Sequence, residues 1–224
     1  MPLPLAALAL FMMAILPGGG SNVWGRDMTD TRLPAAAARD DVAAIGKLIG
    51  EGAAVDGRDG EGRTALLVAT HANRVAAARA LIAAGADVNA KDAIHDSPYL
   101  YAGARGHLDI LKLTLEHGAD LSSTNRFGGT ALIPAAERGH VETVRTLIRA
   151  GVDVDHVNRL GWTALIEAII LSDGGPRHQE IVRLLIAAGA DVNIADKEGV
   201  TPLQHARRHG YRPIVEMLAA AGGR

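Results

Sequence analysis

The sequence contains no cysteine and few aromatic residues, and these absences exclude several kinds of protein. Without cysteine, the 224-residue chain forms no disulfide, no thiolate zinc site and no cysteine nucleophile. Aromatic residues make up 3% of the chain, and its apolar residues are mostly Ala, Leu, Ile and Val. Small side chains pack helices closely but do not fill a deep globular core. We therefore expect thin layers of short helices.

A strong excess of charge of either sign is also lacking. The formal net charge is −2 at pH 7, so the chain lacks the long-range attraction with which basic proteins bind nucleic acids and acidic membranes. The sequence has no glycine-rich phosphate loop, no Gly-x-Ser-x-Gly elbow and no convincing pair of acids. We therefore expect no nucleic-acid partner, no catalytic activity and no cofactor.

The chain has only one long uncharged run, residues 3–16, which is followed at once by Pro17 and three glycines. About 14 residues are too few to span a bilayer comfortably but match the apolar region of a secretory signal. We predict a signal-peptide-like segment at 1–20 and a flexible linker at 21–32. The expected location is periplasmic or extracellular, with no stable membrane span after signal removal. A cytoplasmic protein or a chain anchored by its amino terminus is the alternative.

Two markers recur along the rest of the chain with one period. A threonine or serine opens an equivalent phrase at Thr64, Ser97, Thr130, Thr163 and Thr201. A glycine ends a helical run at Gly52, Gly85, Gly118, Gly151 and Gly189. Both series have the spacings 33, 33, 33 and 38. Two markers that share a period and an irregularity indicate a repeat protein.

Each repeat predicts two short helices and a turn. The first helix begins at the threonine or serine, whose hydroxyl accepts an unpaired amide hydrogen of the first turn. The second has apolar residues at helical spacing, as at Val141, Val144 and Leu147, and ends at a glycine in the left-handed conformation. Phrases such as ADVNAKD then favour tight turns. Because a helix pair of this size cannot bury its apolar face alone, neighbouring units must stack.

These phrases closely resemble the ankyrin-repeat family. The resemblance rests on TPLQHA at Thr201, GHVETVRTLIRAG at Gly139, and AAGADVN at both Ala83 and Ala187. It implies an all-α solenoid of about six stacked helix-turn-helix units with projecting β-turns. A tetratricopeptide array is the alternative, but that family lacks the phrase in which glycine precedes the turn. The expected domain is 33–224, with units at about 33–62, 63–96, 97–129, 130–162, 163–200 and 201–224.

The chain departs from the family pattern in two respects. The histidine that usually follows Thr-Pro-Leu is replaced at Leu67, Leu100, Ile133, Ile166 and Gln204. The fifth unit also has five extra residues within Ser172–Glu180, where Gly174, Gly175 and Pro176 favour a loop. This insertion is either a tolerated surface loop or an extra contact finger beside a binding groove.

The histidines do not predict a metal site. His107 and His140 are 33 residues apart and stand in the Gly-His phrase that starts the second helix, a structural position in the family. His205 and His209 are four residues apart and could share one helix face, as metal ligands can. No third ligand stands nearby at a suitable spacing, so we expect no bound metal.

The resemblance implies a binding surface, because ankyrin repeats generally bind through the turn tips and the exposed side of the first helices. We therefore predict a non-catalytic, monomeric protein-protein interaction module with a partner of acidic or mixed charge. Tryptophan and arginine are enriched among the residues that dominate binding energy, and both types occur at these positions in the central units. The predicted partner-binding residues are Ile94, Asp96, Arg105, Arg126, Phe127, Glu137, Arg138, Arg159, Leu160 and Trp162.

The aromatic residues also have a purely structural interpretation. Trp162 can pack on the neighbouring turn, and Tyr99 and Tyr101 occupy positions that normally face the core. A second class of function is a small-ligand-binding or enzyme-accessory protein that uses the groove and the loop 172–180.

Overall fold

The computed structural model describes residues 31–224, so the signal-like segment 1–20 and most of the expected linker lie outside the described residues. The described part contains α1 (Arg32–Ala38), α2 (Val42–Gly50), α3 (Ala65–His71), α4 (Val75–Ala83), α5 (Pro98–Arg105), α6 (Leu108–Glu116), α7 (Leu132–Glu137), α8 (Val141–Ala150), α9 (Ala164–Ile170), α10 (Pro176–Ala187), α11 (Pro202–His209) and α12 (Arg212–Ala220). Between residues 31 and 224 there is no β-strand, only an isolated bridge between Arg58 and Thr64. None of these helices is long and apolar enough to cross a bilayer.

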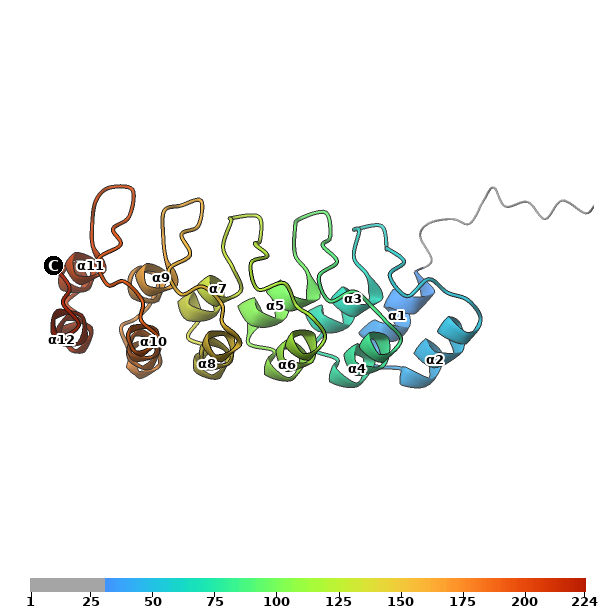
Figure 1. Ribbon diagram of the computed structural model, residues 1–224. Coiled ribbons are helices and arrows are strands. Elements are labelled where there is room, and N and C mark those ends of the chain that lie inside the picture. Colours follow the sequence, from blue (N-terminus) through green and yellow to red (C-terminus); the bar gives the residue numbers. More distant parts are fainter. Residues whose placement is uncertain (1–30) are drawn as a thin grey trace, which may run out of the picture.

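The helices form six antiparallel pairs that stack into two rows (Figure 1). Each odd-numbered helix packs against the next odd-numbered helix, each even-numbered helix against the next even-numbered one, and the two members of a pair against each other. The loops that join one pair to the next project from the side of the odd-numbered row (Figure 1). This arrangement confirms the predicted all-α solenoid of stacked helix-turn-helix units with projecting turns.

The predicted caps hold the start of most first helices. The side chains of Thr64, Ser97, Thr163 and Thr201 each accept a hydrogen bond from the backbone N–H three residues later, at 3.2 to 3.3 Å. In α11 the bond is reciprocal, because the Gln204 side chain accepts from the Thr201 N–H at 3.2 Å. Each cap pairs amide hydrogens that the helix itself leaves without an acceptor.

Thr130 is the exception, and the expectation that it caps its helix is wrong. Its hydroxyl is buried without a hydrogen-bond partner. The capped helices begin one residue after their threonine or serine, whereas α7 begins two residues after Thr130. In the fifth unit the Glu167 N–H donates to the Thr163 carbonyl at 3.0 Å. The equivalent residue in α7 is Pro134, which has no N–H to give. The first backbone bond is therefore absent, and the helix start shifts away from Thr130.

This difference predicts unequal effects of the same substitution at two equivalent threonines. Thr163→Val removes a functioning cap and should lower the free energy of unfolding by about 1 kcal/mol. Thr130→Val removes a buried hydroxyl that has no partner, so its effect should lie near zero or be slightly stabilising. Urea unfolding of the full chain measures both, and equal losses would contradict this account of α7.

The core runs between the two helix rows along the stack. Its largest fully enclosed side chains include Leu66, Leu81, Tyr99, Ile110, Leu111, Leu132, Leu147 and Leu165. At the positions where the family usually has histidine, the Leu and Ile residues of units two to five are buried as well. Apolar packing therefore takes the place of the histidine network at those four positions.

The projecting turns share one hydrogen-bond pattern. The side-chain oxygen of Asp59, Asp92, Asn125, Asn158 or Asp196 accepts from the backbone N–H groups two and four residues later, at 2.8 to 3.1 Å. Such bonds fix a tight turn without help from a sheet. Neighbouring turns are also tied together, for example by the Arg159 guanidinium, which donates to the Arg126 carbonyl at 2.9 Å. The turn tips are thus held in a regular row.

Candidate functional site

A groove of about 360 Å³ lies between the projecting turns and the first helices of the middle units. Residues of α5, α7 and α9 and of three successive turns line it. We call it the central groove and define it by Asp96, Tyr101, Ala104, Arg105, Asn125, Arg126, Phe127, Gly129, Ile133, Pro134, Glu137, Arg138, Asn158, Leu160, Trp162, Glu167 and Leu171.

Eight of the ten predicted partner-binding residues line the central groove: Asp96, Arg105, Arg126, Phe127, Glu137, Arg138, Leu160 and Trp162. The other two lie outside it. Ile94 is half exposed at the tip of its turn, and the Arg159 guanidinium is bonded to the neighbouring turn. The period of 33 residues brings the eight together, because it sets equivalent positions of successive units side by side.

The apolar side of the groove is unusually exposed. Phe127 is 52% exposed, Leu160 46% and Leu171 49%, and Trp162 beside them is partly buried. Contiguous apolar surface of this kind marks interaction sites more often than single exposed apolar residues do.

Arginines line the groove in fixed positions. Arg126 Nη1 lies 3.8 Å from Asp96 Oδ2, and its guanidinium lies 4.9 Å from the centre of the Phe127 ring. Arg138 Nη1 donates to the Ala104 carbonyl at 3.0 Å. A guanidinium has five N–H donors, so these contacts orient the arginines and leave donors for a ligand.

The expectation that Tyr101 faces the core is wrong. Tyr101 lines the central groove, where its ring stacks on His71 with the centres 3.9 Å apart and its hydroxyl accepts from Arg105 Nε at 3.2 Å. The position is equivalent to Pro134 and Glu167, and all three side chains line the groove. Only Tyr99, two residues earlier, enters the core, where it is fully buried.

Glu167 is a groove residue that the sequence did not predict. It is 6% exposed, and its Oε1 accepts from Asn158 Nδ2 at 2.8 Å. Burial raises the pKa of Glu167 to about 7, and the nearby charge of Glu137 adds to the rise, while the Asn158 bond and Arg138 oppose it. A sequence signal existed: Glu167 is the only charged residue in TALIEAII and stands nine residues after the turn residue Asn158.

The insertion of the fifth unit is partly helical. The sequence favours a loop through Ser172–Glu180, but α10 already begins at Pro176. Proline fits the first helical position because its fixed φ suits a helix and its missing N–H is not needed there. Residues 138–140 separate α7 from α8 in the fourth unit, so the equivalent loop here, 171–175, is only two residues longer, and the other extra residues extend the start of α10.

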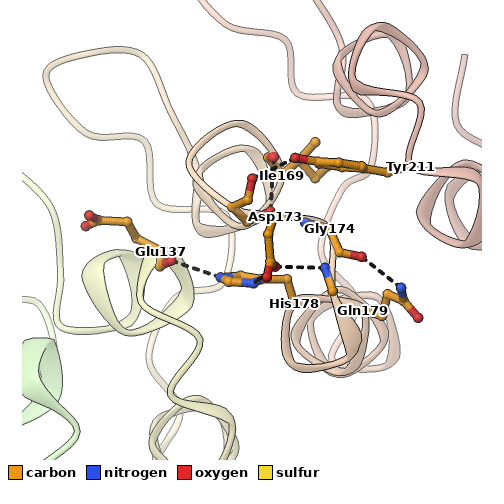
Figure 2. A network of polar contacts seen from close by, with 9 residues as sticks. Glu137, Ile169, Asp173, Gly174, His178, Gln179 and Tyr211 are labelled. Atoms are coloured by element: carbon orange, nitrogen blue, oxygen red, sulfur yellow. Dashed lines mark hydrogen bonds and ion pairs between the residues drawn. The ribbon is translucent and has the colours of Figure 1, made fainter.

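A polar network anchors this loop to both neighbouring units (Figure 2). Towards the fourth unit, His178 Nε2 lies 3.0 Å from the Glu137 carbonyl, and His178 Nδ1 lies 3.3 Å from Asp173 Oδ1. Towards the sixth unit, the Tyr211 hydroxyl donates to the Ser172 carbonyl at 2.6 Å. The loop therefore connects three units, and its first residue, Leu171, lines the central groove.

The paired histidines of the last unit are engaged in other contacts. His205 Nε2 lies 2.7 Å from Asp196 Oδ2, and the His209 ring stacks on Tyr211 with the centres 5.2 Å apart. Within the described range 31–224, no group of three His, Asp or Glu side chains could hold a metal ion.

Models of the ankyrin repeat match three parts of the chain. A three-copy model matches 99–196, a many-copy model matches 176–219, and a single-repeat model matches 61–93. A search of curated proteins finds no match.

Several solved structures are similar along most of the chain. An ankyrin repeat domain from Acinetobacter baumannii AYE is 64% identical, with a TM-score of 0.85, over 87% of this chain and 99% of that one. A second crystallised ankyrin repeat protein is 44% identical, with a TM-score of 0.81, over 84% and 96%. The ankyrin repeat domain of Bcl-3, a member of the IkappaB protein family, is 27% identical, with a TM-score of 0.78, over 87% of each chain.

The chain belongs to the ankyrin-repeat family. Ankyrin repeats are in general protein-protein interaction modules, and the fold is in general a non-enzymatic scaffold.

Proposed function

We propose that the protein binds a segment of another protein, of acidic or mixed charge, in the central groove and catalyses no reaction itself. The observation that carries the proposal is the joint presence of exposed Phe127 and Leu160, partly buried Trp162 and three arginines in one groove. A few residues supply most of the binding energy at protein interfaces, and tryptophan, tyrosine and arginine are enriched among them. The groove is preformed, since its turns and guanidinium groups are held by hydrogen bonds, and this lowers the entropic cost of binding.

Replacing Phe127, Trp162 and Arg126 together by alanine should weaken capture of the partner at least about 100-fold, because central aromatic and arginine residues each contribute about 2 kcal/mol or more. The partner is first captured from native extract with the full chain and identified, and the dissociation constants of wild type and variant are then compared.

The control is a triple variant that changes exposed residues outside the groove, Val42→Ala, Arg149→Ala and Val157→Ala. It should bind as the wild type does. Both triple variants should melt within about 3 °C of the wild type, because five of the six replaced side chains are exposed and Trp162 is only partly buried. If the groove variant binds the partner with the affinity of the wild type, the central groove is not the binding site.

A second candidate function is the binding of a small ligand. The volume of the central groove lies within the range of small-molecule pockets, roughly 300 to 1,000 Å³, and Glu167 supplies a buried polar group. A thermal-shift screen with metals and metabolites separates the two functions. A saturable shift that Glu167→Gln abolishes would favour this second candidate.

We also propose that the protein is exported, on the basis of the uncharged run at 3–16 and the small residues before Ser21. The mass of the amino terminus in periplasmic and cytosolic fractions tests this proposal. An intact Met1 in the cytosol would contradict it.

A further inference from the structure

One corner of the central groove contains a buried carboxyl group with one oxygen left for a ligand. Asn158 holds Glu167 Oε1, and the Asn158 side chain is itself fixed by the N–H groups of Leu160 and Trp162 at 2.9 and 3.1 Å. Glu167 Oε2 has no hydrogen-bond partner anywhere in 31–224, although only 6% of the residue is exposed. Because Glu167 lines the groove, Oε2 is the oxygen available to a bound molecule.

The next pair of equivalent residues along the chain contains an internal partner for its carboxylate. There the equivalent pair is Asp196 and His205, again nine residues apart, and the imidazole contacts the carboxylate at 2.7 Å. In the pair formed by Asn158 and Glu167 the turn residue is an asparagine, which donates one hydrogen bond but carries no charge. Glu167 is therefore a buried acid that no cationic side chain of residues 31–224 contacts directly.

The charged side chains near Glu167 do not neutralise the negative charge of its carboxylate. On α7 the Glu137 carboxylate repels its charge, while Arg138, which caps α7, attracts it. Arg138 is already engaged by the Ala104 carbonyl and lies 3.8 Å from Glu137, and it forms no ion pair with Glu167 within 4 Å. On the other helices packed against α9, His178 of α10 contacts Asp173 and His205 of α11 contacts Asp196.

We infer that this corner of the groove, formed by Glu167, Asn158 and the apolar side chains of Leu160, Trp162 and Leu171, receives a lysine or arginine side chain of the partner segment. The aliphatic part of such a side chain packs on the apolar wall, and its charged end reaches Oε2. A hydrogen bond between a charged amine or guanidinium and a carboxylate is roughly twice as strong as one between neutral groups. The arginines along the rest of the groove then contact acidic residues of the same segment. This inference rests on the proposed function.

The test selects peptides from a phage-displayed library of random dodecapeptides on the full chain at pH 8. The selected sequences should share one basic residue next to apolar and acidic residues. A selected peptide, blocked at both ends, is then made with lysine or with norleucine at that position. For the wild type, norleucine should weaken binding about tenfold or more. For Glu167→Gln the two peptides should bind within about threefold of each other.

A second readout uses pH. The carboxylate must be ionised to pair with lysine, so the affinity of the wild type for the lysine peptide should rise from pH 6 to pH 8. The norleucine peptide should show no such rise.

The outcomes separate this inference from the proposed function. Peptides that need Phe127 and Trp162 but show no preference for lysine over norleucine would overturn the inference and leave the proposed function standing. The same would follow if Glu167→Gln left the lysine preference intact. If no peptide is enriched, or if Phe127→Ala and Trp162→Ala leave binding unchanged, the result would contradict both the inference and the proposed function.

Discussion

Gly174→Ala is expected to lower the free energy of unfolding by roughly 2 to 5 kcal/mol, through backbone strain and overpacking together. Gly174 has a φ of +64°, which side chains rarely adopt, and a Cβ there would lie 2.4 Å from Tyr211 Cδ1 and 2.6 Å from Cγ. A tyrosine ring held by its hydroxyl to the Ser172 carbonyl cannot move aside without losing that bond. The substitution thus strains the loop and the contact with the last unit.

The effect should concentrate in α11 and α12, because each repeat is stabilised mainly by its direct neighbours. Gly210→Ala is the matched control: its φ is +72°, but a Cβ there would meet nothing within 4 Å. It should cost only the backbone strain, roughly 1 to 2 kcal/mol. Hydrogen exchange in α11 and α12 distinguishes the two variants, and equal loss of protection would show that contact with Tyr211 is unimportant.

Glu167→Gln is expected to stabilise the protein at pH 8 by roughly 2 to 3 kcal/mol and to have little effect at pH 5. The pKa of Glu167 is raised from 4.5 to about 7 in the folded protein, mainly by burial. Between these two values the folded state binds a proton that the unfolded state has released, so the contribution of Glu167 to stability falls as pH rises. Glutamine avoids this loss because it is never charged.

The matched control for that prediction is Glu116→Gln, on the exposed side of α6. It should change the free energy of unfolding by less than about 0.5 kcal/mol at both pH values. Urea unfolding of the three proteins at pH 5 and pH 8 measures the differences. A stabilisation by Glu167→Gln that is the same at both pH values would show that Glu167 is not a buried acid of raised pKa. A group that costs stability in the free protein fits a role in binding.

The fold could be predicted because its determinants are local and repeated. Gly151, for example, ends α8 with a φ of 90°, as the phrase LIRAGVDV predicts, and the same signal recurs in the other units. The sequence predicts a cap at Thr130 because the same phrase is capped in the other units. Pro134 has no N–H to donate to the Thr130 carbonyl, so α7 begins later and the Thr130 hydroxyl stays unpaired. A repeat period describes the average unit and does not show how one residue changes it.

The composition of the groove could be predicted only in part. The period shows that Phe127 and Trp162 lie on neighbouring turns, but it gives no indication of how deeply a side chain is buried. Glu167 and Tyr101 were missed because the exposure of their position depends on the turn that packs over it. The Glu167 carboxyl accepts a hydrogen bond from Asn158, and this contact joins a turn to α9. The binding role of the groove residues stays a prediction.

Hydrogen exchange of the full chain, with and without the captured partner, tests most directly whether the partner binds in the central groove. A partner bound in the central groove should add protection in the turns at 123–129 and 156–162 and in α5, α7 and α9, with no change in the row of second helices. Protection confined to α4, α6, α8 and α10, with the central groove unchanged, would contradict this prediction.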